Sequence, residues 1–213
     1  MDVTRLLVIR HGETAWNKDT RIQGQTDIPL NEVGHWQAQQ TALALAQEPI
    51  AAVYSSDLLR AYHTAAPIAQ ALGLPVQTEQ ALRERHFGVG QGRTWAELEQ
   101  DDPEMVRQWK ARLPDFAPAT GESLNTLKAR VEAVVHRLAA HHRGEQIVLV
   151  AHGGVLDIIY RMATQLPVDS PRTWLIANAS INRVLWHPDG MSMVGWADVG
   201  HLSATETRDE QAA

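Results

Sequence analysis

The chain has 213 residues, of which 19 are basic and 25 acidic, so its formal net charge is −6 at pH 7, and it contains no cysteine. The lack of cysteine excludes a disulfide scaffold, a thiolate metal site and a cysteine nucleophile, and the acidic balance argues against nucleic acid as a partner. Length and a 44% share of hydrophobic residues predict one globular domain over residues 1–204, followed by a frayed tail over 205–213.

The N-terminal segment carries only a short apolar run. This run, Leu6–Ile9, is much shorter than the core of a signal peptide or a membrane span. We therefore expect a cytoplasmic protein that does not bind membranes.

Four apolar runs predict buried strands, at residues 6–9, 50–54, 75–78 and 147–150. The first and last of them lack polar alternation, which is typical of strands buried on both faces of a parallel sheet. Apolar residues at helical spacing over 124–138 and 155–162 predict helices between and after the strands. This alternation predicts a three-layer α/β sandwich with a mostly parallel central sheet and flanking helices.

The C-terminal part of the sequence predicts an antiparallel hairpin at one edge of this sheet. Residues 180–186 and 191–196 flank Pro188-Asp189-Gly190, a turn sequence that favours a hairpin with an antiparallel edge strand. Its open edge could pair with a second copy and give a homodimer. Residues 94–120 are rich in charge and proline, and they predict a helical insertion over the sheet edge.

Charged side chains follow the first strand directly. Arg10 and His11 stand where that strand ends, and ligands of open α/β sheets bind at the carboxyl ends of the strands. Alone, the pair would be better explained by a histidine that caps its own strand, because two-residue motifs recur by chance.

A second histidine follows another buried strand. His152 and Gly153 open a helix, where backbone N–H groups favour anions. Together with Arg10 and His11 they predict a compact cationic pocket, and the glycine next to each histidine would let a ligand approach closely.

Two further side chains fit such a pocket. Arg60 stands in the first turn of the helix after residues 50–54 and could grip a phosphate with two N–H groups, although a solvated helix face is the alternative. Glu84 could serve as an acid near neutral pH if burial and an anionic ligand raised its pKa. Its alternative is an ion pair with Arg83 or Arg85.

Taken in order, these motifs resemble the histidine phosphatase superfamily, in its phosphoglycerate mutase-like branch. The residues that match are Arg10-His11-Gly12-Glu13-Thr14, Asn17, Gln23-Gly24, residues 55–61, Glu84, Gly121-Glu122-Ser123 and His152-Gly153. The resemblance implies that His11 is the nucleophile and Glu84 the proton donor. It also implies a set of phosphate- and substrate-binding residues, which are Arg10, Arg60, His152, Asn17, Gln23, Gly24 and Gly153.

Elementary chemistry agrees with these roles. An imidazole that is largely neutral at pH 7 can attack phosphorus without a separate base. Two guanidinium groups and a histidine would stabilise the charge on the transferred oxygens in place of a metal. Glu84 would protonate the departing alkoxide and then activate the water that hydrolyses phospho-His11. We therefore expect neither a metal nor another cofactor.

The segment after Glu84 bears on the reaction type. It lacks the Asn-Lys pair and the long basic insertion of the mutases, and it resembles the phosphatase type. It carries Gly90 and Gln91 where phosphatase members have Trp and Glu, which would leave the turn that contacts substrate bare. We therefore predict a metal-independent phosphatase that acts on small phosphorylated metabolites. The alternatives are a 2,3-bisphosphoglycerate-dependent phosphoglycerate mutase and a non-catalytic phosphate-binding protein.

Four more residues have open roles. Arg107, Lys110 and Arg112 on the insertion could meet a substrate carboxylate or second phosphate, or they could form a solvated helix face. Their apolar neighbours could instead form a lid. His201 resembles a histidine that lies near the pocket mouth in phosphatase members of the family.

Overall fold

The computed structural model describes residues 3–203, so the tail predicted for residues 205–213 lies outside the described part. Its strands and helices are, in chain order, β1 (Thr4–Arg10), α1 (Ala15–Lys18), α2 (Glu32–Leu45), β2 (Ala52–Ser55), α3 (Leu59–Leu72), β3 (Val76–Thr78), α4 (Trp95–Asp101), α5 (Pro103–Lys110), α6 (Leu124–His141), β4 (Gln146–Ala151), α7 (Gly153–Thr164), β5 (Ile181–His187) and β6 (Gly190–Asp198). Short 3-10 helices cover Gln80–Leu82, Gly88–Gly90 and Gly200–Leu202.

The six strands form one mixed sheet in the order β3-β2-β4-β1-β5-β6. The strands from β3 to β1 pair in parallel, while β5 pairs antiparallel with β1 and with β6. The mostly parallel sheet with a hairpin at its edge is therefore confirmed. Because β5 runs against β1, the segment that leads into β5 lies at the same end of the sheet as the carboxyl end of β1.

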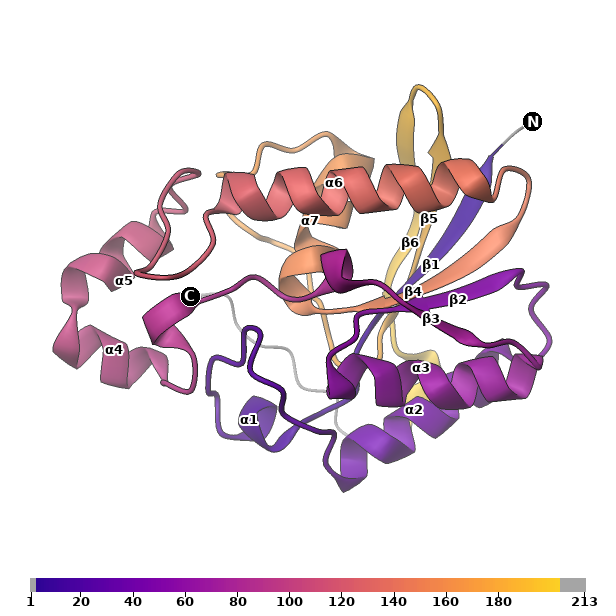
Figure 1. The fold of residues 1–213 in the computed structure, drawn as a ribbon, viewed down its shortest axis with the longest axis horizontal. Helices are drawn as coiled ribbons and strands as arrows, with labels where there is room; N and C mark the ends of the chain where they lie inside the picture. The colour runs from indigo at the N-terminus through magenta and orange to yellow at the C-terminus, as the bar shows by residue number, and fades with distance from the viewer. Residues whose placement is uncertain (1–2, 204–213) are drawn as a thin grey trace.

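Helices cover both faces of the sheet, as Figure 1 shows: α6 and α7 lie on one side, and α2 and α3 on the other. The side chains of β1 alternate between these layers. Leu6 and Val8 join the core under α6 and α7, whereas Leu7 and Ile9 join the core under α2 and α3. Burial on both faces explains why the strand carries no polar alternation. The three-layer sandwich is confirmed.

The insertion forms two short helices, α4 and α5, which lie beyond the carboxyl ends of the parallel strands (Figure 1). They hold a small core of their own, in which Leu98 and Val106 pack against Ile22. The prediction that the insertion covers the sheet edge is therefore wrong. Its apolar residues pack on the loop after β1, which places it at the carboxyl ends of the parallel strands.

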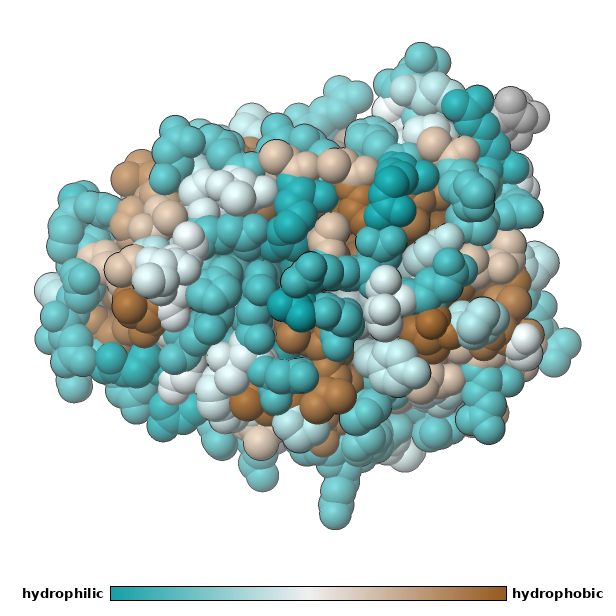
Figure 2. All heavy atoms as spheres, in the orientation of Figure 1, coloured by the Kyte–Doolittle hydropathy of each residue, from teal (hydrophilic) through white to brown (hydrophobic). Residues whose placement is uncertain are grey.

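Hydrophilic residues cover most of the face shown in Figure 2, and hydrophobic residues reach that surface in small separate patches. Within residues 3–203, no helix combines the length and the apolar character that a membrane crossing requires.

Candidate active site

A cavity of about 810 Å³ opens at the carboxyl ends of β1 and β4. The structure brings into its wall most of the residues singled out from the sequence, which are Arg10, His11, Asn17, Gln23, Gly24, Arg60, Glu84 and Gly153. His152 lies directly behind, with its ring centroid 5.2 Å from that of His11. Residues that are far apart in the sequence thus converge on one centre, because the two central strands end side by side.

His11 is held in a single tautomer by its own backbone. Its Nδ1 lies 2.7 Å from the carbonyl oxygen of Gly12, which can only accept, so Nδ1 carries the proton and Nε2 keeps a lone pair. Burial and the charges of Arg60 and Arg10 hold the pKa of His11 well below its ordinary value, against the opposing effect of the Gly12 contact. The imidazole is therefore neutral at pH 7, as a nucleophile must be.

The glycine after His11 serves packing rather than ligand access. A Cβ on Gly12 would stand 2.5 Å from the carbonyl oxygen of Gly34, because the start of α2 crosses the loop there. The Gly12 N–H donates to the hydroxyl of Thr64 at 2.9 Å. The expectation that this glycine makes room for the ligand is wrong, since the room is taken by α2.

Two buried arginines supply positive charge beside His11. Arg60 donates to the carbonyl oxygens of Gly24 at 2.6 Å and Thr26 at 2.8 Å, and Arg10 donates to the carbonyl oxygen of Ile176. Arg60 lies in the first turn of α3 and is completely buried, so it is not a solvated helix-face residue. These carbonyl groups orient the two guanidinium groups.

His152 has unsatisfied hydrogen-bonding capacity. It is completely buried, and neither of its ring nitrogens has a hydrogen-bond partner in the described part of the chain. Burial, followed by the charge of Arg60 and the neighbouring His11, lowers the pKa of His152 well below the ordinary value. Buried polar atoms without a partner are rare in folded proteins, and one explanation is a ligand that supplies the missing contact.

Glu84 lines the same cavity. The backbone N–H of Gly154 donates to both Glu84 carboxylate oxygens, at 3.1 and 3.0 Å, and the backbone N–H of Arg85 donates to one of them at 2.7 Å. A Cβ on Gly154 would stand 2.3 Å from the Glu84 carboxylate, so only glycine admits the acid at the start of α7. Arg83, one of the partners considered from the sequence, instead forms an ion pair with Asp57 at 2.6 Å.

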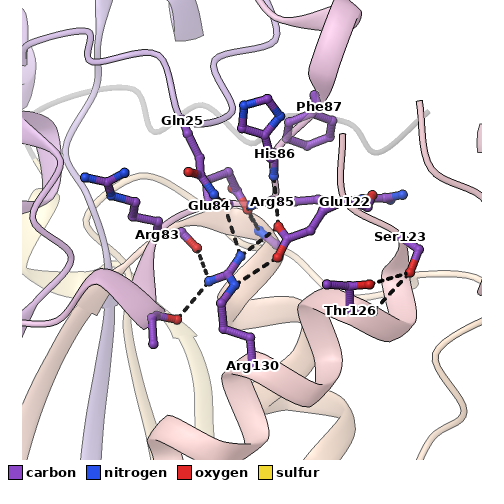
Figure 3. A network of polar contacts seen from close by, with 12 residues as sticks. Gln25, Arg83, Glu84, Arg85, His86, Phe87, Glu122, Ser123, Thr126 and Arg130 are labelled. Atoms are coloured by element: carbon purple, nitrogen blue, oxygen red, sulfur yellow. Dashed lines mark hydrogen bonds and ion pairs between the residues drawn. The ribbon is translucent and has the colours of Figure 1, made fainter. Parts of the chain in front are cut away.

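A clamp behind the site holds the Glu84 segment in place, as Figure 3 shows. Arg130 on α6 donates to the backbone carbonyl groups of Ala81, Arg83 and Glu84 at 2.8 to 3.3 Å. The same guanidinium binds both carboxylate oxygens of Glu122, at 2.9 and 2.8 Å. We call Arg130 and Glu122 the clamp. The pair fixes the position of the backbone from which the Glu84 side chain extends.

The Glu122 carboxylate also accepts the His86 N–H at 3.0 Å, so the clamp fixes the chain on both sides of Glu84. This contact gives a structural reason for the Gly121-Glu122-Ser123 motif, which the sequence marked without a role.

The substrate entrance is supported by a side chain that the sequence analysis undervalued. Gln91 accepts the Gln25 N–H at 2.8 Å, and its amide group lies 3.4 Å from the Thr26 hydroxyl. Gly90 packs against Leu98 and Ile22. Neither Gly90 nor Gln91 is among the residues of the cavity wall, which agrees with the expectation that this turn is bare toward the substrate. Gln91 instead braces the loop that carries Gln23 and Gly24.

His201 and two of the insertion cations do not reach the site. The His201 ring lies 3.2 Å from the Thr41 hydroxyl on α2 and is absent from the cavity wall, so its expected place near the pocket mouth is wrong. Arg107 and Lys110 are exposed and pair with Glu104 and Glu99. Arg112 lines the cavity, so it is not part of a solvated helix face.

The structure adds residues that sequence reasoning missed. Asn178 lies in the cavity wall and donates to the carbonyl oxygen of His11 at 3.0 Å. Arg85, Trp109 and Arg172 line the same cavity. The position of Asn178 just before an antiparallel strand is a usable signal, since that strand starts at the end of the sheet where β1 finishes.

Cationic side chains line this cavity. Most of them are arginines, whose guanidinium groups suit oxyanions, and Lys18 adds an ammonium group. Within residues 3–203, no group of three or more His, Asp or Glu side chains lies close enough together to hold a metal ion.

Comparison with known proteins places this geometry in a family. Residues 6–199 match the histidine phosphatase superfamily (branch 1). The chain is 40% identical over 209 residues to phosphoglycerate mutase-like protein 4 of Arabidopsis thaliana, covering 96% of this chain and 90% of that protein. It is also 40% identical over 207 residues to the metal-independent phosphoserine phosphatase of Arabidopsis thaliana, covering 95% and 85%.

A solved structure supports the same conclusion. The mycobacterial glucosyl-3-phosphoglycerate phosphatase in complex with VO3 has a TM-score of 0.80 and 34% sequence identity, and the match covers 90% of this chain and 98% of that one. Sequence, fold and the paired histidines agree. The chain belongs to branch 1 of the histidine phosphatase superfamily.

Proposed function

We propose that the protein hydrolyses small phosphorylated metabolites through a phosphohistidine intermediate on His11, with no metal or other cofactor. The observation that carries this proposal is the state of His11. Its Nδ1 proton is donated to the Gly12 carbonyl oxygen, which leaves the lone pair on Nε2, and the ring lies within reach of the charges of Arg10 and Arg60 and 5.2 Å from the His152 ring. A neutral nucleophile surrounded by cations suits attack on a phosphate dianion.

In the first step, Nε2 of His11 forms a bond to phosphorus while the bond from phosphorus to the ester oxygen breaks. The departing alkoxide takes a proton from the Glu84 carboxyl group, and Glu84 is then a carboxylate. Arg10 and Arg60 bind the phosphoryl oxygens, and a ring N–H of His152 supplies a further contact. That contact would satisfy a nitrogen that otherwise has no partner.

In the second step, the Glu84 carboxylate accepts a proton from water as the water oxygen attacks phosphorus. The bond from phosphorus to Nε2 breaks, and inorganic phosphate and neutral His11 are restored. The Glu84 carboxyl group thus acts first as an acid and then as a base. Its hydrogen bonds to the Gly154 N–H, at the start of α7, would hold it in one position for both steps.

Family membership, together with relatives named as phosphatases, classes the chain as a phosphoric monoester hydrolase. The VO3 complex of the mycobacterial relative shows that a phosphatase of this fold binds that oxyanion. A second candidate is phosphoglycerate mutase activity, since another relative is named phosphoglycerate mutase-like protein 4. In that case, a second hydroxyl group would replace water as the acceptor.

The direct test is phosphate release from a panel of phosphoglycerates, phosphoserine, sugar phosphates and nucleotides, in the presence of a chelator. Wild type is compared with His11→Ala. We expect release that resists the chelator and is lost in the variant. Release retained by His11→Ala would overturn the mechanism. Isomerisation of phosphoglycerate that depends on 2,3-bisphosphoglycerate, without net phosphate release, would support the mutase instead.

A further inference from the structure

One turn of the chain lies against the groups that surround the nucleophile. This turn, residues 176–180, leads into β5, and we call it the support turn. Because β5 runs antiparallel to β1, the support turn lies beside the carboxyl end of β1, where His11 follows. The carbonyl oxygen of Ile176, at its start, accepts a hydrogen bond from the Arg10 guanidinium. The support turn thus contacts the site through residues that have no role in the proposed chemistry.

Asn178 joins the support turn to two residues of the site. Its side-chain NH2 group donates to the His11 carbonyl oxygen at 3.0 Å and lies 3.4 Å from Oδ1 of Asn17. Both of these oxygens can only accept, so the NH2 end of the Asn178 amide is fixed toward them. The same Asn17 oxygen accepts the Thr14 N–H at 3.0 Å, which leaves the Asn17 NH2 group as the donor that a bound anion can meet.

The other end of the Asn178 amide is unsatisfied. The residue is only 1% exposed, and its Oδ1 has no hydrogen-bond partner in the described part of the chain. A buried polar atom without a partner destabilises the folded state. Asparagine at this position is therefore poorly suited to stability alone, although its NH2 group is well placed beside the nucleophile.

The backbone of the support turn has a second destabilising feature. Ala179 is completely buried and has a φ of 56°, in the left-handed region that residues with a side chain rarely adopt. In this conformation its N–H donates to the carbonyl oxygens of Arg10 at 3.1 Å and His11 at 3.3 Å. Strain and an unsatisfied oxygen thus occur in neighbouring residues, and both accompany hydrogen bonds to the end of β1.

Asn182 offers an internal comparison, because it is a buried asparagine that makes the same kind of contact. It lies on β5, and its NH2 group donates to the Val8 carbonyl oxygen on β1 at 3.0 Å. Its Oδ1 accepts the Ala197 N–H at 2.7 Å, so both ends of this amide are satisfied. Asn182 is not among the residues of the cavity wall, whereas Asn178 is. The first asparagine therefore supports the sheet, and the second contacts the site.

We propose that Asn178 is a positioning residue for phosphoryl transfer. Its amide holds the His11 main chain and the Asn17 side chain in place, so that the His11 ring and the Asn17 NH2 group meet the same phosphoryl group. Asn178 acts through these two residues and takes no part in bond formation. A nucleophile displaced by about 1 Å can lose about a hundredfold in rate, so such support is significant. This inference rests on the proposed phosphatase function and adds a residue to its machinery.

The test compares Asn178→Ala with the matched control Asn182→Ala. Rapid quenching measures the rate at which p-nitrophenyl phosphate phosphorylates His11, and calorimetry measures the Kd of inorganic phosphate. We expect Asn178→Ala to slow phosphorylation by roughly ten- to hundredfold and to weaken phosphate binding by roughly tenfold. Asn182→Ala should leave both close to the wild-type values.

The order of stability should be the reverse. Asn182→Ala removes an amide that is satisfied at both ends, whereas Asn178→Ala also removes an unsatisfied oxygen. In urea unfolding without phosphate, the midpoint should therefore fall further in Asn182→Ala than in Asn178→Ala. A purely structural role would put the larger loss of activity in the less stable variant.

A second pair of variants covers a failure to fold. If Asn178→Ala does not fold by circular dichroism, Asn178→Ser and Asn182→Ser replace the alanine pair. Serine is well tolerated in turns, and its short side chain does not span the distance that the Asn178 amide covers. The same expectations apply.

Three outcomes would overturn the inference. Asn178→Ala could match wild type in phosphorylation and phosphate binding, Asn182→Ala could lose as much of both, or Asn178→Ala could be both the less active and the less stable of the two. In each case, wild-type phosphate release that is lost in His11→Ala would leave the phosphatase function standing. Absence of release from every compound of the panel would instead count against the function itself.

Discussion

The Nδ1 atom of His11 points at the carbonyl oxygen of Gly12, 2.7 Å away, so the chain itself decides which nitrogen of the imidazole meets the substrate. We expect the phosphoryl group on Nε2 and none on Nδ1, because Nδ1 has no lone pair in this tautomer. Rapid quenching with a phosphorylated substrate, followed by alkaline digestion and phosphorus NMR, separates the two isomers. His11→Ala should yield no phosphohistidine. A phosphoryl group on Nδ1 would contradict the tautomer assigned here.

The role of Glu84 is tested by Glu84→Gln, which keeps an oxygen for the N–H groups of Gly154 and Arg85 and removes the transferable proton. For alkyl phosphates we expect kcat to fall by about 10² to 10⁴, the range typical of a lost general acid. With p-nitrophenyl phosphate, whose leaving group needs no proton, phosphorylation of His11 should be much less affected. A pre-steady-state burst measures that step. Equal loss for both classes of substrate would argue that Glu84 only supports the structure.

Replacing Arg130 of the clamp, which lies outside the cavity wall, should change activity in the same way as Glu84→Gln. Arg130→Lys keeps the charge but not the fork that reaches Glu122 and three backbone carbonyl groups. We expect a loss of stability of about 1 to 3 kcal/mol in urea unfolding, because several charge-assisted hydrogen bonds are weakened. Activity should fall more for alkyl phosphates than for p-nitrophenyl phosphate, as in Glu84→Gln.

The matched control for the clamp is Lys128→Gln on the same helix, where an exposed lysine pairs with Glu132 at 3.8 Å. Such surface pairs contribute roughly 0 to 1 kcal/mol, so this variant should behave like wild type. Equal losses in both variants would mean that the effect of Arg130→Lys is not specific to the Glu84 segment.

The two central histidines predict a dependence of stability on pH. Burial and the neighbouring positive charges hold the pKa values of His11 and His152 well below 6.5, the ordinary value that unfolding restores. Below pH 6.5 the unfolded chain therefore binds more protons than the folded one, and the free energy of unfolding falls as the pH falls. Above that pH the contribution is constant.

Urea unfolding between pH 7.5 and pH 5 measures this effect. Replacing one histidine, as in His152→Asn, should flatten the decline by up to about 1.4 kcal/mol per pH unit. His11→Gln provides an independent second variant. The explanation fails if wild type and both variants show the same slope.

The predictable part of the fold is the part governed by burial on two faces. Residues 6–9 and 147–150 could be assigned to central strands because a strand covered by helices on both sides has no polar alternation. Once those strands are adjacent, the histidines that follow them must meet. Two buried strands, each followed by a histidine, were thus enough to predict the centre of the candidate site, while the strand order came from the structure.

The remaining parts depend on contacts between distant segments. Arg85 looks like a partner of its neighbour Glu84 in the sequence, yet its side chain is held by carbonyl groups of Phe116 and Glu122. Likewise, Gly12 owes its identity to close packing against Gly34 at the start of α2. Such constraints are invisible in local composition, because they arise only after the layers have packed.

Arg60 lines the candidate site, and it also donates to the carbonyl oxygens of Gly24 and Thr26 in the loop at its entrance. In the proposed mechanism, the same guanidinium would bind both this loop and a phosphoryl oxygen. A loop conformation that displaces the guanidinium would then weaken phosphate binding, and bound phosphate would disfavour that conformation by the same free energy. A single side chain would thus couple the order of the entrance to the occupancy of the site.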